Sequence, residues 1–348
     1  MGKVTIKDIA KRSGYSKTSV SFAFNNPGRV AKETYEHIMA VAQEMGYSPD
    51  PAARILATRK TKTVGFLLPQ PIEEIFDNQY LSELMRGIGS VCHREGFMLS
   101  VLSPLKGIIS QTIQQACVDG IIILGVSNSS SVHAQFRQRK LPYVTMDADN
   151  SADYLNVGID DEKAAEEMLD LLLDYGHRRI CFCTLQPIST DIVDTEFSLT
   201  SDNRGNGILK SIKKHNLEET AKNSFIFYEA SHKQEEAIKK AREILTMPNR
   251  PTAIYCMGDH QAIPFYFVAA QLGLKIPQDL SITGFDDLPS SSMLFPPLTV
   301  VHQPGYEKGR LAAELLVASL NGQECKSVLM ESPVIERGST AKVPENAK

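Results

Sequence analysis

Several candidate ligand contacts stand directly after apolar, strand-like runs of this 348-residue chain. Four of them are aspartates, which follow the runs YVTM, LNVGI, AIYCMG and SITGF. A tyrosine and an arginine at the beginnings of predicted helices complete the set. The candidates are Tyr80, Asp147, Asp160, Arg204, Asp259 and Asp286. Carboxylates and one guanidinium group around a cleft are good bidentate hydrogen-bonding partners for sugar hydroxyls, so we predict a site for a small polar ligand.

Two other roles are open for these acids. An aspartate after a strand often caps the next helix, and Asp160-Asp161 is the clearest case because a helical stretch follows it directly. Two carboxylates that face one glycosidic bond could also catalyse its hydrolysis. However, the chain contains no GxSxG, no HExxH and no glycine-rich phosphate loop. We therefore predict no enzyme activity, no cofactor and no metal, and we interpret His177 in YGHRR as a structural turn residue.

Alternating strands and helices must position these residues. The strand-like runs lie at 64–68, 98–102, 120–124, 143–146, 155–159, 179–183, 224–227, 253–257, 280–285 and 298–301. Helical stretches separate most of them, at 79–95, 162–175, 204–215, 233–246, 260–272 and 306–321. This alternation predicts an α/β fold with parallel sheets that carry helices on both faces, and so many strands require two sheets. Ligands of such folds bind at the carboxyl ends of the strands.

The stretch TIKDIAKRSGYSKTSVSFAFN at 5–25 predicts two short helices joined by a tight turn. Thr5 and Asp8 resemble a capping box at the first helix, and Gly14 supplies the permissive backbone of the turn. Ser16 is a good N-cap for a second helix over 17–25. Such a pair, with a small polar outer face, describes a helix-turn-helix that presents its second helix to a DNA major groove.

Charge favours DNA binding over the alternative that this helical pair binds nothing. Residues 1–62 carry eleven Lys or Arg and five acids, a net charge of +6, whereas the remaining 286 residues carry −10. A basic head suits contact with phosphates, and an acidic body suits solubility. A third helix at 32–45, with Ile38, Val41, Ala42 and Met45 on its apolar side, is expected to complete a three-helix core.

The segment YSPDPAARILAT at 47–58 has two interpretations. Asp50 and Pro51 can begin a short helix there, and a helix of this length is not stable alone in water. It could be a hinge that folds on DNA, with Leu56 entering a minor-groove step as an apolar wedge. It could equally be a plain linker whose apolar residues, Ile55 and Leu56, pack on the body.

Together, VTIKDIAKRSGYSKTSVSFAFNN and YSPDPAARILATRKT resemble the N-terminus of the LacI family of bacterial repressors. The resemblance continues through DYGHRRI at 174–180, RGNG at 204–207, IPQDLSITGFDD at 276–287, PPLTVVHQP at 296–304 and ERGST at 336–340. It favours the hinge interpretation. It also implies two flavodoxin-like lobes like those of periplasmic sugar-binding proteins, with the chain crossing between them several times.

The resemblance implies a helix-turn-helix domain at 1–48, a hinge helix and linker at 49–62, an effector-binding and dimerisation core at 63–341, and a tail at 342–348. Lobe one is expected at 63–161 and 291–323, and lobe two at 162–290 and 324–341. The family implies a homodimer on a pseudo-palindromic operator, with an effector in the cleft that changes the lobe angle and the stability of the hinge helices. No heptad-rich tail follows ERGST, so we do not expect a tetramer built by a C-terminal helical bundle.

The same resemblance sorts the candidate ligand contacts. Arg204 in RxxG and Asp286 in GFDD match effector-contacting positions of the family, and Asp147 and Tyr80 match pocket positions. Asp259 lies in a Gly-Asp pair where many relatives have Asn-Asp, so one side-chain contact is missing. We expect a sugar or sugar derivative as the effector, although the chain has no tryptophan to stack on a pyranose ring.

On the DNA side, Lys17, Thr18 and Phe22 lead the exposed face of the second helix and are the predicted base-edge readers. Two of the DNA-facing positions depart from the family. Many relatives carry arginine in place of Phe22, which cannot donate a hydrogen bond to guanine and could touch a thymine methyl or fold inward. The usual asparagine is Asp50 here, which places a negative charge near DNA.

The remaining DNA contacts fall into two sets. Thr5, Ser16, Ser21, Asn25 and Arg29 suit phosphate contacts, which set register without reading sequence. The hinge set comprises Ala53, Arg54 and Leu56, of which Ala53 and Leu56 match the family's minor-groove residues.

The distribution of apolar residues and cysteines indicates where in the cell the protein is located. No run approaches the roughly 18 apolar residues of a membrane span, and MGKVTIKDIAKRSG lacks the apolar core of a secretory signal. The six cysteines show no metal-ligand spacing, and Cys181 and Cys183 alternate as on one face of a strand. These features predict a cytoplasmic protein with buried free thiols and no membrane partner.

We therefore predict a sequence-specific transcriptional repressor whose partners are double-stranded operator DNA, a small effector and a second copy of the chain. One alternative is a sugar-binding protein without a DNA role, against which the basic head and the missing signal peptide argue. The other is a carbohydrate-processing enzyme, against which the missing catalytic motifs argue.

Overall fold

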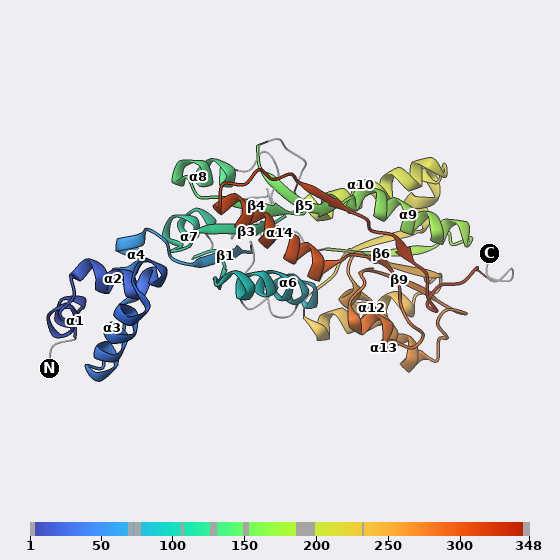
Figure 1. Ribbon diagram of the computed structural model, residues 1–348. Coiled ribbons are helices and arrows are strands. Elements are labelled where there is room, and N and C mark those ends of the chain that lie inside the picture. Colours follow the sequence, from blue (N-terminus) through green and yellow to red (C-terminus); the bar gives the residue numbers. More distant parts are fainter. Residues whose placement is uncertain are drawn as a thin grey trace. The chain divides into compact units, whose positions relative to one another are not determined.

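The chain forms two compact units, Met1–Thr61 and Lys62–Lys348, shown as a ribbon in the computed structural model of Figure 1. The structure describes residues 4–68, 72, 78–105, 108–125, 131–148, 153–185, 199–231 and 233–343.

Helices make up the first unit. They are α1 (Ile6–Ser13), α2 (Lys17–Asn25), the short 3-10 turn η1 (Pro27–Arg29), α3 (Lys32–Glu44) and α4 (Pro51–Thr58). The core between α1, α2 and α3 consists of the buried side chains Ile9, Val20, Ala23, Ile38, Val41 and Ala42. Phe24 and Met45 pack against this core while remaining half-buried. The predicted three-helix core is confirmed.

Local signals set the ends of the first two helices. The backbone N–H of Thr5 donates to Asp8 Oδ2 at 2.9 Å, which is the reciprocal half of a capping box. Gly14 ends α1 with φ of +76°, a left-handed conformation that glycine adopts without steric cost. Ser16 Oγ accepts from the Ser19 backbone N–H at 3.0 Å and caps α2. The turn between the two helices therefore follows from residue types.

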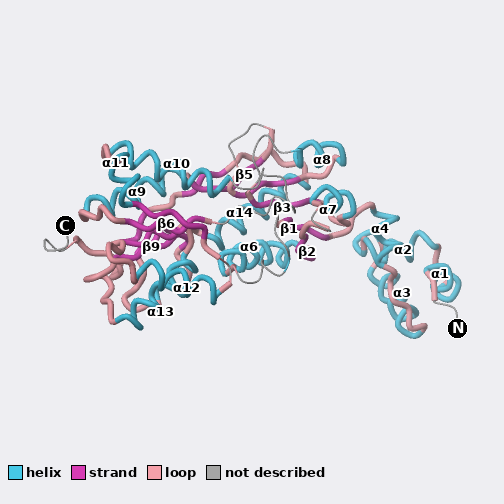
Figure 2. Tube along the Cα trace, turned by 180° about the vertical axis from the view of Figure 1, so that it is seen from behind, coloured by secondary structure: helices cyan, strands magenta, loops and turns pink. Residues whose placement is uncertain are grey.

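The second unit contains two lobes, each built on a six-stranded sheet (Figures 1 and 2). Sheet one has the order β11-β5-β4-β3-β1-β2, and all its neighbouring strands are parallel. Its strands are β1 (Thr63–Leu67), β2 (Met98–Leu102), β3 (Gly120–Leu124), β4 (Tyr143–Met146), β5 (Leu155–Ile159) and β11 (Val328–Met330). Apart from β11, this is the doubly wound order of the flavodoxin-like folds.

Helices cover both faces of sheet one. The helices α6 (Gln79–Glu95) and α14 (Gly305–Leu320) pack on one face, where Leu84, Ile88 and Leu316 join one apolar cluster with strand residues. The helices α7 (Ile109–Gln115) and α8 (Ser131–Arg139) pack on the other face. The inner strands β1, β3, β4 and β5 are largely buried between these helices, which explains why they read as continuous apolar runs, whereas the edge strands β2 and β11 are more accessible.

Sheet two repeats this plan with the order β12-β10-β9-β8-β6-β7. Its strands are β6 (Ile180–Thr184), β7 (Phe225–Glu229), β8 (Ala253–Cys256), β9 (Ser281–Asp286), β10 (Thr299–His302) and β12 (Val334–Ile335), and only β12 runs antiparallel to its neighbour. The helices α12 (Gln234–Leu245) and α13 (Ala262–Leu272) cover one face. The helices α9 (Asp161–Asp174) and α10 (Leu199–Lys214) cover the other, and α11 (Glu218–Ser224) follows α10.

The alternation along β6 is as predicted. Cys181 and Cys183 are fully buried among the side chains of α12 and α13, whereas Ile180 and Phe182 point to the α9 and α10 side. Cys92, Cys181, Cys183 and Cys256 are buried free thiols as predicted, whereas Cys117 is exposed and Cys325 is half-buried, so the prediction is wrong for these two. The described residues contain no group of three His, Cys, Asp or Glu side chains that could hold a metal ion.

The predicted lobe limits near the C-terminus are wrong. The resemblance implies 291–323 in lobe one and 324–341 in lobe two, but β10 pairs with β9 in sheet two, and β11 pairs with β5 in sheet one. The physical reason is that β10 continues the buried ladder of its own sheet, so the chain crosses to lobe one only after His302. It crosses back after β11. Two short strands, β11 and β12, and the helices α7, α8 and α11 were not predicted.

Candidate functional site

The exposed side of α2 carries the predicted base-edge readers. Lys17 and Thr18 are exposed in the first turn of the helix, next to the capping residue Ser16, which is also exposed. No acidic residue lies in that turn. The positive end of the helix macrodipole and the Lys17 ammonium therefore favour an anionic partner such as DNA.

Phe22 is half-buried on the same helix. The Arg29 guanidinium lies over its ring, 5.4 Å from the ring centroid. This places a cation beside the aromatic face of Phe22. Ser21 and Asn25 hold each other, because Asn25 Nδ2 donates to the Ser21 carbonyl oxygen at 3.0 Å and to its hydroxyl at 3.3 Å. The predicted DNA contacts on α2 thus lie on one helix face.

Thr5 lies at the start of α1, and its hydroxyl donates to Asp8 Oδ2 at 2.7 Å. This bond and the Thr5 backbone bond hold the pKa of Asp8 below its usual value, so the carboxylate stays charged. A phosphate contact from Thr5 would compete with that bond. Thr5 therefore has a clear capping role, and its predicted phosphate contact remains a prediction.

The predicted hinge segment is a helix in the structure. Asp50 Oδ1 accepts from the Ala52 backbone N–H at 3.0 Å, and Pro51 occupies the first turn, so Asp50 caps α4. No residue of α4 is buried. Ala53 and Arg54 are exposed, and 83% of Leu56 is accessible. A helix of this length is not stable alone in water, and its exposed leucine is available to a partner surface.

In the second unit, polar residues from both lobes meet in one buried cluster. Lys308 on α14 has no exposed surface, and its Nζ donates to Asp147 Oδ1 at 2.6 Å. The same ammonium donates to Tyr80 Oη at 2.8 Å and to Gln303 Oε1 at 2.6 Å. Gln303 Nε2 donates to Asp286 Oδ1 at 2.8 Å. Tyr80, Asp147 and Asp286, predicted as separate contacts, therefore belong to one hydrogen-bonded network.

The carboxyl ends of β4 and β9 have unusual backbone conformations. Asp147 has φ of +52°, Asp286 has +129° and Asp287 has +59°. Non-glycine residues rarely adopt positive φ, and such residues concentrate at functional sites where the surroundings hold them in place. The positive φ values of these aspartates therefore indicate that the carboxyl ends of β4 and β9 belong to a functional site.

Arg204 lies beside this cluster and is itself buried. Its Nε donates to Asp161 Oδ1 at 2.8 Å, and another nitrogen donates to the Met257 carbonyl oxygen. The guanidinium carbon lies 3.5 Å from the Phe285 ring centroid. Burial raises the pKa of Asp161 although Arg204 opposes the shift. The ion pair is thus fully desolvated, which makes each partner strongly dependent on the other.

Replacing Arg204 with alanine is expected to lower the free energy of unfolding by about 3–5 kcal/mol, because Asp161 would remain as an unpaired buried charge. Urea unfolding measures this change. The double variant Arg204→Met/Asp161→Asn removes both charges and should recover most of the loss. A loss below about 1 kcal/mol in Arg204→Ala would mean that the pair is solvated in solution.

Asp286 differs from Asp147 and Asp161 because it has no ion pair in the described parts of the chain. Its accessible fraction is only 7%. Burial raises the pKa of Asp286 to about 8, with Arg204 opposing the shift. At neutral pH its carboxyl group is therefore largely protonated and can donate a hydrogen bond as well as accept one.

The structure places the other two predicted acids differently. Asp160 is exposed, and its Oδ1 accepts from the Lys163 backbone N–H at 3.0 Å, so it caps α9. Its neighbour Asp161 is the acid that meets Arg204. Asp259 is buried, and its Oδ2 accepts from the Leu288 backbone N–H at 2.8 Å and from the Ser291 hydroxyl at 2.5 Å. It organises the loop after β9, while its Oδ1 lacks a partner within the described residues.

Sequence reasoning missed Asp161, Gln303 and Lys308. The sequence does contain a pattern that could have identified Lys308 as buried. The buried side of α14 includes Gly305, Lys308, Gly309, Ala312 and Leu316. These positions follow the helical period, and a lysine on an apolar stripe requires a buried partner. Gln303 had no such signal, since it lies in the segment between β10 and α14.

Family models match both parts of the chain. The model described as "Bacterial regulatory proteins, lacI family" matches residues 5–50, and the "Periplasmic binding protein-like domain" model matches residues 169–340. The HTH-type transcriptional repressor PurR of Aliivibrio salmonicida is 28% identical to this chain. The alignment covers 97% of this chain and 99% of that protein. PurR of Pectobacterium carotovorum is 29% identical over 98% of both chains. The chain belongs to the lacI family.

As a lacI-family member, the protein is a DNA-binding transcriptional repressor and not an enzyme. Solved structures have the same fold. The lac repressor dimer bound to operator and the anti-inducer ONPF matches with a TM-score of 0.78 at 19% identity, covering 98% of this chain and 100% of that one. A CelR-cellobiose complex matches with a TM-score of 0.66 at 21% identity, covering 97% and 100%. No helix within the described ranges of this lacI-family chain is long and apolar enough to cross a bilayer.

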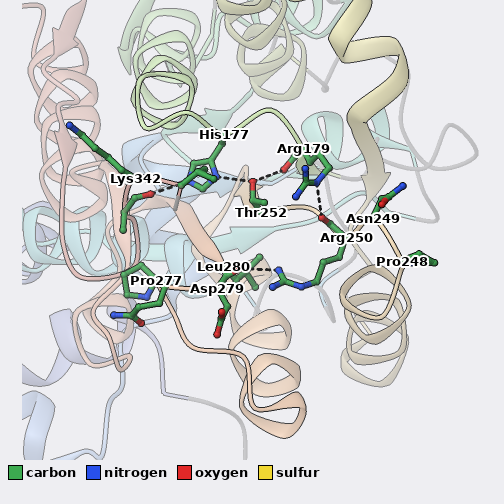
Figure 3. Close-up of a pocket in the computed structure, with 13 residues that line it drawn as sticks. His177, Arg179, Pro248, Asn249, Arg250, Thr252, Pro277, Asp279, Leu280 and Lys342 are labelled. Carbon is green, nitrogen blue, oxygen red and sulfur yellow. Dashed lines mark hydrogen bonds between the residues drawn. The ribbon is translucent and has the colours of Figure 1, made fainter. Parts of the chain in front are cut away.

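His177 of this lacI-family chain lines a cavity of about 570 Å³ at the amino ends of β6, β8 and β9 (Figure 3). Its Nδ1 lies 2.9 Å from Thr252 Oγ1, and its Nε2 lies 3.0 Å from Ser281 Oγ. Arg179, Arg250 and Lys342 also line the cavity, but the Lys342 side chain extends away from the two arginines. His177 therefore joins strand ends and the C-terminal segment, in agreement with its interpretation as a structural residue.

Burial lowers the pKa of His177 to about 4, below the unfolded value of about 6.5. The unfolded chain then binds a proton more readily, so this contribution to stability is complete above pH 6.5 and is lost as the pH falls towards 4. We expect His177 to lower the free energy of unfolding by about 2 kcal/mol between pH 7 and pH 5. Urea unfolding at both pH values, with His177→Gln as the reference, isolates this contribution. Equal pH dependence in parent and variant would contradict it.

Proposed function

We propose that this repressor binds an operator as a homodimer and that a small polar ligand, expected to be a sugar or sugar derivative, sets its affinity for that DNA. The observation that carries the proposal is the pairing, on one chain, of an exposed helix-turn-helix with a buried polar cluster that draws on two lobes. The helix-turn-helix is the proposed DNA-binding element, and the buried polar cluster is the proposed ligand-binding site.

The composition of the cluster supports a hydroxyl-rich ligand. Asp286 can donate and accept, Arg204 carries a guanidinium group, and Tyr80 offers a phenol. Two solved structures with this fold hold sugars: the CelR complex holds cellobiose, and a LacI-family regulator from Enterococcus faecium holds ribose at 20% identity, with a TM-score of 0.66 over 81% of this chain and 100% of that one.

An apolar surface in lobe two supports the homodimer. Ile263 and Phe267 are exposed on α13, at 44% and 48% of their surface, and Met293 and Phe295 are exposed at 81% and 95%. Tyr266 Oη donates to the Pro296 carbonyl oxygen at 2.8 Å, so α13 and the loop that carries Met293 and Phe295 are neighbours. Large exposed apolar patches mark interaction sites, and a two-fold dimer buries the same patch from both copies.

The ligand acts in this proposal through a coupling free energy. It binds more tightly to one arrangement of the two lobes, and that arrangement favours or disfavours the ordered α4 hinge on DNA. Because its partner is chromosomal DNA, we place the protein in the cytoplasm.

A gel-shift titration on the DNA next to its own gene tests the DNA part of the proposal. We expect a shift whose affinity falls steeply between 50 and 200 mM salt, as phosphate contacts require. A sugar and nucleoside panel in the same assay should contain a compound that changes the shift. If no salt-sensitive shift occurs with or without any compound, the proposed function is wrong.

A further inference from the structure

Lys308 is a charged residue in a fully enclosed position of lobe one. An ammonium group has three N–H donors, and Lys308 places them on Asp147 Oδ1, Gln303 Oε1 and Tyr80 Oη at 2.6, 2.6 and 2.8 Å. Its donors are therefore all used within the protein. Lys308 therefore has no N–H donor left for an anionic ligand, and its ammonium group links three protein side chains.

Gln303 is the member of this set that joins the lobes. It follows β10 of sheet two and precedes α14, which packs on sheet one. Its Oε1 accepts from Lys308 and from Tyr80 Oη at 2.8 Å, both in lobe one. Its Nε2 donates to Asp286, at the end of β9 in lobe two. One amide group thus contacts lobe one through its oxygen and lobe two through its nitrogen.

We propose that Lys308 is the positioning residue of an interlobe latch formed by Lys308, Gln303 and Asp286. Lys308 fixes the oxygen of the Gln303 amide, which leaves the nitrogen aimed at Asp286 and so restrains the angle between the lobes. The regulatory consequence of the latch rests on the proposed function, because it matters for DNA only if lobe arrangement and operator affinity are coupled.

The ion pairs of the cluster leave Asp286 as the acid that a ligand can reach in competition with the latch. Arg204 is paired with Asp161, and Lys308 is paired with Asp147. Lys308 also occupies Asp147 Oδ1, an oxygen that a ligand hydroxyl would otherwise use. Asp286 is then the acid whose described hydrogen bond comes from a neutral amide. A ligand donor that reaches Asp286 competes with the Gln303 amide, so occupation of the site opens the latch.

Distances between spin labels on the two lobes test the latch without operator or effector. Cys117 is exposed in lobe one, and Lys239→Cys on α12 adds a label site in lobe two, with Cys325→Ser to prevent labelling there. Labelled chains are diluted with unlabelled chains, so that distances within one chain dominate. The latch variants are Gln303→Ala and Lys308→Met/Asp147→Asn. The second leaves no unpaired charge, and asparagine tolerates the left-handed backbone of position 147.

We expect one narrow distance distribution in the parent and a shifted distribution, or one of about twice the width, in both latch variants. The exposed-lysine control Lys163→Met should reproduce the parent. Parent-like distances in both latch variants would overturn the proposal, even if their melting temperatures fall, because lost packing alone lowers stability without moving the lobes. Failure of the parent to bind DNA would refute the proposed function and would leave this readout intact.

Discussion

Replacing Phe295 with aspartate is expected to dissociate the homodimer and to weaken operator binding by a factor on the order of 100 or more. Phe295 is 95% exposed beside the equally apolar Met293. A charge in the middle of a self-complementary apolar interface appears twice, once from each copy, and is desolvated each time. A monomer then binds only one half-site and loses the additional affinity that a dimer gains by binding two half-sites at once. Analytical ultracentrifugation and an operator titration measure the two effects.

Phe267→Asp on α13 provides an independent test of the same face and should behave alike. The control is Leu209→Asp on α10, an exposed leucine on a different part of lobe two with 61% accessibility. If Phe295→Asp and Phe267→Asp both sediment as dimers with parental operator affinity, the dimer uses another surface. If Leu209→Asp also dissociates the dimer, the effect is not specific to the proposed face.

Leu56→Ala is expected to lower operator affinity on the order of 30-fold, while affinity for an effector stays within about twofold. An apolar wedge in the minor groove supports a kink that brings more protein surface to DNA, and alanine is too short to fill the opened step. The exposed position of Leu56 on α4 is consistent with a side chain that finds its partner only on DNA. Fluorescence anisotropy with a labelled operator measures the change.

The matched control for this variant is Leu209→Ala, which removes another exposed leucine, 61% accessible against 83% for Leu56, far along the chain. It should bind operator like the parent. Equal operator affinity of Leu56→Ala and the parent would support the plain-linker interpretation of 49–62. Circular dichroism should give the same helix content for both variants in the absence of DNA, because no buried contact is removed.

The strands of the second unit were predictable because parallel sheets covered on both faces produce continuous apolar runs. Four predicted strands, at 98–102, 120–124, 143–146 and 155–159, coincide with β2 to β5. The strand β12 is two residues long, and β11 has three with Leu329 exposed at 61%, so neither leaves a pattern. Their positions depend on pairing with distant strands, which a single stretch of sequence does not encode.

The site was predictable where a residue type is unusual for its position. Arg204 and the aspartates after strands stood out in the sequence, and the structure buries Arg204, Asp147, Asp259 and Asp286. The pairing could not be predicted. Asp160 and Asp161 are adjacent and chemically equal, and only the direction of the first turn of α9 decides that Asp160 caps the helix while Asp161 meets Arg204.

The DNA-binding helix was predictable from local signals, whereas its base preference was not. Thr5, Gly14 and Ser16 determine where the first two helices begin and end. The sequence allows both an outward and an inward orientation of Phe22, and in the structure Phe22 is half-buried with Arg29 over its ring. The cation beside the exposed face of α2 is therefore supplied by Arg29 and not by residue 22, and the residue types on α2 do not reveal this pairing.

Operator affinity and effector affinity, measured on the same protein, test the central claim most directly. A panel of sugars and nucleosides is titrated by calorimetry into the protein with and without operator DNA, and operator is titrated with and without the compound that binds. We predict that one compound changes operator affinity by at least about fivefold and that operator changes the affinity of that compound by the same factor, since linkage requires reciprocity. Tight binding of a compound with operator affinity unchanged would contradict the account.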